Sequence, residues 1–258
     1  MHKSEQEYSS FRDLSMLLIS WNCDSAKPDS LVANPINYEF LNEALTSVDS
    51  PDIIAFGFQE VVDLESRKMT AKTVLLGGKK KPEDNGLSDK VTGAYKRWYD
   101  RLTAAVRTAM PPDSPYVCVH TENLVGLFTC IFVKASEQVG LDDVAVATIK
   151  RGMGGRYGNK VRFMSLNESS TNLKQGAIVA RFVIGDSSVC VINCHLAAGQ
   201  NAVRRRNADA AGILEEKMVF PIGDHSLAYT GGGDGTMVLD HELVFVSVFW
   251  NLFQVLLN

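Results

Sequence analysis

The sequence predicts a mixed α/β fold, and three observations support this. Short apolar runs alternate with segments of helical periodicity, as in the predicted strand 14–21 and the helix 38–48 that follows it. Two alternating runs, 176–184 and 189–195, flank Gly-Asp-Ser-Ser and predict an antiparallel hairpin. No internal repeat is present. The hairpin excludes a clean succession of parallel βαβ units.

Each remaining element follows from the same two patterns. Short apolar runs bounded by polar residues are typical of buried strands, and an apolar stripe every three or four residues is typical of helices. Further strands are predicted at 52–58, 116–120, 126–134 and 144–149, and further helices at about 61–76, 94–109 and 202–218. Gly-rich, charged residues predict surface loops at 77–93 and 221–236.

Composition narrows the class of protein. The 258 residues are 45% hydrophobic and 22% charged, which excludes a disordered chain, a collagen and a coiled coil. The formal net charge of −4 does not favour a general nucleic-acid binder. The 5 cysteines are odd in number and form no C-x-x-C pair, so they indicate core residues of a protein in a reducing compartment. No secretory signal is visible at the N-terminus.

Polar side chains follow the first two predicted strands directly. Asn22 ends the run 14–21, and Gln59 and Glu60 follow 52–58. Carboxylate and carboxamide oxygens suit a hard cation such as Mg²⁺. Carboxylates at strand ends are common, however, so each position taken alone is far more often an ordinary polar residue than a metal ligand.

Two more segments could carry chemistry. Residues 151–160, RGMGGRYGNK, combine four glycines with basic residues, and such a loop can approach a phosphate closely. The segment is neither a Walker loop nor G-x-G-x-x-G, and a plain flexible hairpin remains an equal alternative. His195 ends the predicted hairpin, where a histidine can stabilise or protonate a phosphoryl oxygen, although a structural role is more common.

Taken in order, these segments resemble a known family. WN, FQE, a GNK loop and N-x-H, within SWNCDSAKPDSL, FGFQEVVDLESRKMTAK, GMGGRYGNK and NCHLAAGQNAVRRRNAD, are similar to the inositol polyphosphate 5-phosphatases. These belong to the endonuclease/exonuclease/phosphatase superfamily, and the wording is most similar to the fungal and WD-repeat-associated branch. The resemblance covers about residues 9–245. It implies a two-sheet α/β sandwich flanked by helices.

The resemblance also implies a role for each site residue. Glu60 is expected to hold a catalytic Mg²⁺, with Asn22 beside it. His195 is expected to bind the scissile 5-phosphate. Asn193 is expected to orient the catalytic carboxylate without itself contacting the substrate. Asn159 and Lys160 are expected to contact phosphates of the inositol head group.

The expected substrate is a phosphoinositide lipid or a soluble inositol polyphosphate, and not a nucleic acid. The expected location is the cytoplasm, with peripheral contact to membranes. The oligomeric state is left open.

Two segments depart from the family. Its G-D-x-N-Y-R motif, which carries the water-activating aspartate, should follow Phe245 but is absent, as is the later S-D-H motif. Gly223-Asp224-His225 and Asp240-His241 are upstream fragments that we interpret as coincidental. Residues 161–175 separate GNK from the run 176–184, which the family joins directly. Such departures predict a sandwich that lacks its C-terminal third.

Both departures are consistent with translated introns. Val161-Arg162 and Val246-Ser247 can be encoded by sequences that begin with GT, and Lys174-Gln175 by one that ends with AG. We therefore expect a partial catalytic domain over 1–245, an insert at 161–175 and an apolar read-through tail at 246–258. Two alternatives remain open: a non-catalytic fragment, and a nuclease of the same superfamily.

Overall fold

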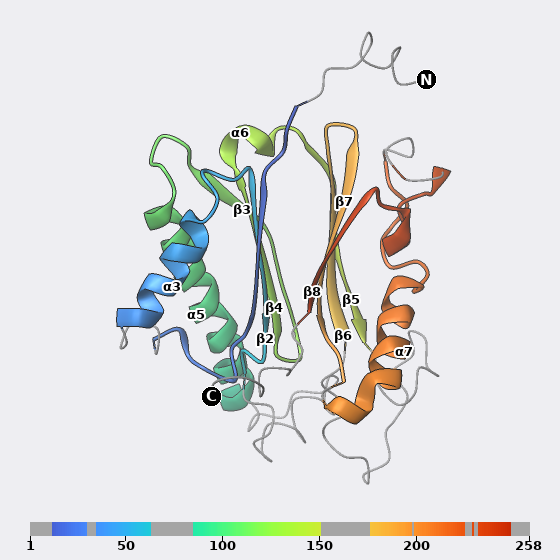
Figure 1. Cartoon of the computed structure of the whole chain (residues 1–258), viewed down its shortest axis with the longest axis horizontal. Helices are drawn as coiled ribbons and strands as arrows, with labels where there is room; N and C mark the ends of the chain where they lie inside the picture. Colours follow the sequence, from blue (N-terminus) through green and yellow to red (C-terminus); the bar gives the residue numbers. More distant parts are fainter. Residues whose placement is uncertain are drawn as a thin grey trace.

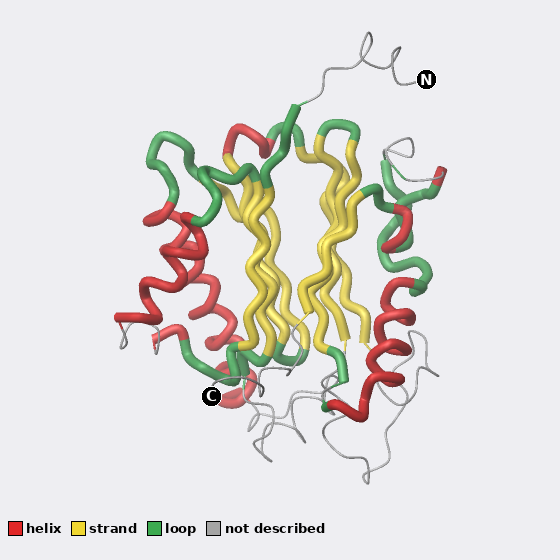
Figure 2. Tube along the Cα trace, in the orientation of Figure 1, coloured by secondary structure: helices red, strands yellow, loops and turns green. Residues whose placement is uncertain are grey.

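The computed structural model describes residues 12–29, 35–62, 85–150, 176–197, 199–224, 229 and 232–248. Two four-stranded sheets pack face to face, and helices cover their outer faces (Figures 1 and 2). The predicted α/β sandwich is therefore confirmed. No helix in the described ranges is long and apolar enough to span a membrane.

The first sheet has the strand order β1-β2-β4-β3. The strands β1 and β2 are parallel, because α3 connects them across the outer face, and β4 is antiparallel to both of its neighbours. The helices α3 and α5 lie on the outer face of this sheet (Figure 1). The elements are β1 (Met16–Asn22), α3 (Pro35–Thr46), β2 (Ile53–Gln59), α5 (Asn85–Ala109), β3 (Tyr116–Leu124) and β4 (Leu127–Lys134).

The second sheet has the order β5-β6-β7-β8. The predicted antiparallel hairpin is confirmed as β6 and β7, and β8 joins β7 in parallel after α7 has crossed the outer face. The elements are α6 (Ala135–Gln138), β5 (Leu141–Lys150), β6 (Gly176–Ile184), β7 (Ser187–His195), η3 (Gln200–Ala202), α7 (Val203–Leu214), η6 (Val238–Asp240) and β8 (Leu243–Val248).

Buried apolar side chains form three layers, as a sandwich covered by helices requires. The layer between the first sheet and its helices is aromatic, with Trp98 packed edge-to-face on Phe58 and Trp21. Aliphatic residues of β2, β4, β6 and β7 fill the space between the sheets. The third layer lies between the second sheet and α7, around Ile192 and Ile213.

The structure corrects several predicted boundaries. α5 begins at Asn85, inside the loop predicted at 77–93, because helical hydrogen bonding extends backwards from the half of α5 that packs on the sheet. Val61 and Val62 are buried but not helical, and the rest of the helix predicted at 61–76 lies outside the described residues. α7 ends at Leu214 with Glu215 as its C-cap, and Met218, predicted on its apolar face, lies beyond the helix with a positive φ and an exposed side chain. The first three residues of the predicted tail, 246–248, belong to β8.

Buried amide groups connect the two sheets. The Asn193 Nδ2 group of β7 donates to the carbonyl oxygens of Phe58 at 3.1 Å and Phe128 at 3.0 Å, and to Thr129 Oγ1 at 3.1 Å. Its Oδ1 accepts a hydrogen bond from Gln59 Nε2 at 2.8 Å. Asn193 and Gln59 are both fully buried. Because an unpaired buried polar group costs far more than a pair contributes, this network fixes the register between the sheets.

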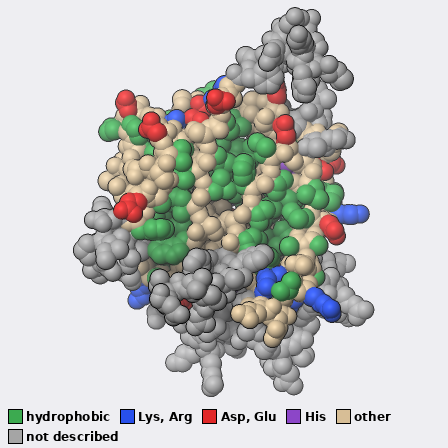
Figure 3. Space-filling view, in the orientation of Figure 1, with side chains coloured by type: hydrophobic (Ala, Val, Ile, Leu, Met, Phe, Trp, Pro, Cys, Tyr) green, Lys and Arg blue, Asp and Glu red, His purple; other side chains and the backbone are tan. Residues whose placement is uncertain are grey.

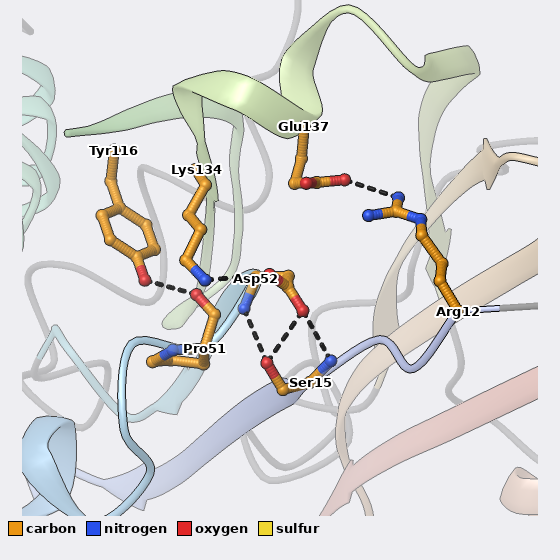
Figure 4. Close-up of polar contacts among 7 residues, drawn as sticks. All are labelled: Arg12, Ser15, Pro51, Asp52, Tyr116, Lys134 and Glu137. Carbon is orange, nitrogen blue, oxygen red and sulfur yellow. Dashed lines mark hydrogen bonds and ion pairs between the residues drawn. The ribbon is translucent and has the colours of Figure 1, made fainter. Parts of the chain in front are cut away.

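A second polar cluster lies at the start of β1 and β2, at the other end of these strands from Gln59 (Figure 4). The Asp52 carboxylate accepts hydrogen bonds from the backbone N–H of Ser15 at 2.8 Å and from its hydroxyl at 2.9 Å. It also accepts one from Lys134 Nζ at 2.9 Å. The Tyr116 hydroxyl donates to the Pro51 carbonyl beside it. These contacts fix the start of β1 against β2 and β4.

Replacing Asn193 by leucine is expected to lower the free energy of unfolding by about 2–5 kcal/mol. The leucine keeps the volume but leaves the carbonyl groups of Phe58 and Phe128 and the Gln59 amide without this partner. Urea denaturation measures the change. Asn123→Leu on the exposed surface of β3 is the control, with a change within about 0.5 kcal/mol. Equal stability of the two variants would contradict the role assigned to Asn193.

Asp52 is expected to make folding stability sensitive to acid. Burial raises the pKa of Asp52, but hydrogen bonds from Ser15 and Lys134 outweigh it, and the pKa is lowered overall. A depressed folded-state pKa contributes stability above the unfolded value of about 3.9, and this is lost as pH falls through the folded-state pKa. Asp52→Asn should therefore lose about 1 kcal/mol at pH 7 and little once the pH lies below the folded-state pKa of Asp52.

Denaturation across this pH range measures the effect, and Asp113→Asn at an exposed position is the control. A difference between wild type and Asp52→Asn that is unchanged from pH 7 to acid would contradict the expectation.

Candidate active site at the ends of β1, β2 and β7

Three strands end at one edge of the sandwich. Asn22 is the last residue of β1, Glu60 follows β2, and His195 is the last residue of β7. β1 and β2 are parallel, with Asn22 beside Gln59, so their carboxyl ends meet. The link from Asn193 to Gln59 then brings the end of β7 to the same place.

The three side chains meet on one carboxylate. Asn22 Nδ2 donates to Glu60 Oε1 at 3.0 Å, and His195 Nε2 lies 3.4 Å from the same oxygen. The Glu60 side chain is 26% exposed and the His195 side chain 13% exposed. The carboxylate is therefore open to solvent on one side while two side chains orient it from the other. Asn22, Glu60 and His195, which the sequence placed after three separate strands, therefore lie together in the structure.

The local backbone is strained where it presents these groups. Glu60 has a φ of 53°, and Asp24 and Ser25 have φ values of 44° and 62°. Backbone hydrogen bonds hold the two loops together, from Cys23 N to Gln59 O at 2.8 Å and from Ser25 N to Glu60 O at 2.7 Å. Such left-handed residues persist only where their surroundings hold them, and they are frequent at functional sites.

Further contacts position the site residues. The backbone N–H of Asp24 donates to Asn22 Oδ1 at 2.9 Å, which leaves the Asn22 amide group directed at Glu60. On the other side, Arg206 Nη1 donates to the carbonyls of Ala197 at 3.1 Å and Gly199 at 2.5 Å. The loop that follows His195 is thereby held against α7.

The residues present fit a hard divalent cation. Among the described residues no group of three or more His, Cys, Asp or Glu side chains could hold a metal. Mg²⁺ does not require one, because it commonly uses one or two carboxylates and completes its shell with water and substrate phosphate. Glu60 offers one partly exposed carboxylate with an amide beside it. The donor set is thus of the kind that Mg²⁺ uses and is unlike a zinc site.

The two predicted head-group residues, Asn159 and Lys160, lie outside the described residues, as does the segment 161–175. The strands on either side of that segment are informative. Lys150 pairs with Gly176, and Gly176 pairs with His195. The ends of β5 and β6 at Lys150 and Gly176 therefore lie beside the candidate active site.

The interpretation of Asp240 and His241 as coincidental is supported by their surroundings. Asp240 Oδ2 accepts a hydrogen bond from the backbone N–H of Met237 at 2.9 Å, as a structural cap. His241 is 4% exposed, contacts the rings of Phe220 and Tyr229, and has a pKa lowered by burial. Both residues serve packing of the segment that precedes β8.

Sequence reasoning missed some of the residues that build the site. Thr129 and Arg206 were not singled out, although both hold groups next to predicted site residues. Thr129 could have been found as a polar residue inside an otherwise apolar strand, and the same signal marks the buried Arg181 of β6. Arg181 is paired with Asp143 at 2.6 Å on the outer face of the second sheet.

Comparison with known proteins identifies relatives of this chain. The chain is 38% identical over 240 residues to a probable inositol polyphosphate 5-phosphatase of Schizosaccharomyces pombe, a match covering 92% of this chain and 19% of that protein. It is 31% identical to synaptojanin of Caenorhabditis elegans, over 79% of this chain and 16% of that protein. The chain thus spans less than a fifth of the length of these relatives.

The fold has a counterpart among solved structures. The inositol polyphosphate 5-phosphatase domain of a synaptojanin, solved with inositol (1,4)-bisphosphate and calcium ion, matches with a TM-score of 0.60 and 20% identity. The match covers 95% of this chain and 55% of that one. The model of Endonuclease/Exonuclease/phosphatase family 2 matches residues 19–251, which include every described site residue. The chain belongs to this family.

Proposed function

We propose that the chain derives from an inositol polyphosphate 5-phosphatase, which removes the 5-phosphate from a phosphoinositide or a soluble inositol polyphosphate. The observation that carries the proposal is the convergence of Asn22 and His195 on the Glu60 carboxylate. This occurs at one edge of a two-sheet sandwich that belongs to the matched family. The printed names of the relatives support the substrate class. Action on a lipid would require peripheral membrane contact, and we place the enzyme in the cytoplasm.

The described side chains suit in-line hydrolysis of a phosphomonoester. His195, when protonated, can donate to a phosphoryl oxygen and stabilise the charge that develops there. Glu60 would hold Mg²⁺, with Asn22 orienting the carboxylate. When bound, Mg²⁺ supplies charge neutralisation at the phosphate. Asn193 positions His195 through the backbone of β7, because its own side chain is fixed to the opposite sheet.

Substrate binding is assigned to the segment between β5 and β6. Asn159 and Lys160 carry a donor and a positive charge that would contact head-group phosphates. The anchors of this segment next to His195 support that assignment. Among the segments that resemble the family, only 151–160 combines glycines with basic residues in the way that is typical of a phosphate-binding loop.

We further propose that the 258 residues contain only part of a catalytic domain. The G-D-x-N-Y-R and S-D-H motifs are absent from the sequence. In the described structure β1 and β8 are edge strands, and Figure 3 shows hydrophobic side chains gathered on the face where these strands lie. Leu243 and Val246 of β8 are 43% and 51% exposed. An apolar face bounded by open strand edges is what a sandwich without its remaining strands would present.

Two other functions remain as test outcomes. A non-catalytic fragment would bind neither metal nor inositol phosphate, whereas a nuclease would cleave DNA. The net charge of −4 and the names of the relatives favour the phosphatase over the nuclease. Phosphate release from phosphatidylinositol bisphosphate, compared with nicking of plasmid DNA, distinguishes them when both are measured on a form that lacks 161–175 and is restored beyond Phe245.

The chain itself is expected to hydrolyse phosphoinositides negligibly. Loss of the residue that orients the attacking water removes about 10²–10⁴ in rate. A version without 161–175 and restored beyond Phe245 should release phosphate in a Mg²⁺-dependent way. Malachite-green detection of phosphate measures both forms.

Glu60→Gln and His195→Ala should each lower the rate of the restored form by at least about 10²-fold. Asp113→Asn, at an exposed position in the turn before β3 and outside the site, is the matched control and should retain full activity. Robust turnover by the 258 residues would show that the missing motifs are dispensable, and the assigned roles would then be wrong.

Deleting residues 161–175 is expected to raise the soluble yield or the melting temperature. The segment is rich in Asn, Ser, Thr and Lys, and it lengthens the connection between two paired strands, β5 and β6. Replacing the segment with a Gly-Ser linker of equal length is the control and should leave stability unchanged. A deletion that lowers stability would contradict the intron hypothesis, as would a mature transcript that retains the segment.

A further inference from the structure

Two cysteines face each other across β3 and β4. Cys118 Sγ and Cys130 Sγ are 3.6 Å apart, at a sequence separation of 12. A β-bulge between Cys118 and His120 displaces the register, so Cys118 is opposite Phe132 while its side chain reaches Cys130. Both side chains point into the layer between the first sheet and its helices.

The two thiols differ in access and in acidity. β3 is the edge strand of its sheet, and Cys118 is half-buried, whereas Cys130 on the inner strand β4 is fully buried. The hydrogen bond with Cys130 lowers the pKa of Cys118 more than burial raises it. The same contact and burial raise the pKa of Cys130. Cys118 is therefore the nucleophile that a small oxidant can reach, and Cys130 is placed to resolve it.

The other cysteines have different surroundings. Cys23, Cys190 and Cys194 are buried, and burial raises the pKa of each, to about 12 for Cys190 and Cys194. Burial and a raised pKa both suppress reaction with peroxide. Oxidation should therefore be confined to the pair on β3 and β4.

We propose that Cys118 and Cys130 form a site of reversible oxidation that hydrogen peroxide converts to a disulfide. The Cys118 thiolate attacks a peroxide oxygen, so that an S–O bond forms, the O–O bond breaks and the leaving hydroxide takes a proton to become water. The Cys130 sulfur, after losing its proton, attacks Cys118 Sγ; the S–S bond forms and the S–O bond breaks, releasing a second water. Overall, two thiols are oxidised and one peroxide is reduced.

The crosslink would join the edge strand β3 to the strand that supports the candidate active site. Thr129, next to Cys130, accepts the hydrogen bond from Asn193, and Phe128 accepts another. The modification itself does not depend on the proposed phosphatase activity. It requires only the strand pairing, so it can be tested on a chain without turnover.

The test treats the folded, purified chain with hydrogen peroxide, removes the peroxide, and then unfolds the chain in guanidinium chloride so that an alkylating agent blocks every remaining thiol, including the buried ones. Intact mass should show 3 of the 5 thiols alkylated, and peptide mapping should give one crosslinked pair containing Cys118 and Cys130. A dithiol reductant should restore all 5. Cys118→Ser and Cys130→Ser should each abolish the crosslink, and Cys194→Ser, at a buried cysteine on β7, should leave it intact.

Peptide mapping of the wild-type chain stands even if a variant fails to fold. Any crosslink to a different cysteine would overturn the proposal. So would a Cys118 that is oxidised to the sulfenic or sulfinic acid without forming a crosslink.

Discussion

The amide of Asn193 is the interaction on which the arrangement of this site depends. It belongs to one sheet, yet its hydrogen bonds run to backbone and side-chain groups of the other. Apolar contacts between two sheets are non-directional and would allow them to slide. Buried hydrogen bonds are directional, and leaving one unmade is costly. Because His195 follows Asn193 by two residues and Glu60 follows Gln59 by one, fixing the amide pair also fixes the distance between the two candidate catalytic groups.

The layers of the fold were predictable because their signals are local. Buried strands such as β2 and the hairpin of β6 and β7 correspond to apolar runs in the sequence that are separated by turn residues. Boundaries were less predictable, because they depend on packing. Glycines near Asn85 favour a loop. The buried stripe of Tyr95, Trp98 and Leu102 stabilises α5 on the sheet, however, and the helix extends towards the N-terminus as far as Asn85. Propensity is weak compared with such tertiary contacts.

The site was predictable to the extent that strand ends mark it. Asn22, Glu60 and His195 were identified by their positions after apolar runs and by family resemblance, and the structure brings them together. Thr129, Arg206 and the positive φ of Glu60 were not predicted. The role of Thr129 depends on a partner 64 residues away in the chain. The role of Arg206 depends on the path of the loop 7 and 9 residues before it, and that of Glu60 on a turn geometry, neither of which the pattern of apolar residues encodes.

The end of β8 connects this network to the intron hypothesis. Ser247 lies in the segment interpreted as read-through, yet its hydroxyl is 2.7 Å from Ser20 Oγ and 3.4 Å from Gln59 Nε2. It fits because residue 57 is glycine: a Cβ there would lie 2.4 Å from Ser247 Oγ. The constraint at residue 247 is thus mainly on the size of its side chain. Any segment that pairs in parallel with β7, whether native or read-through, places this side chain between the two sheets. Pairing with β7 uses backbone groups, which any sequence supplies. A read-through segment with a small residue at 247 can therefore occupy the strand position, and the presence of β8 is compatible with either origin of residues 246–248.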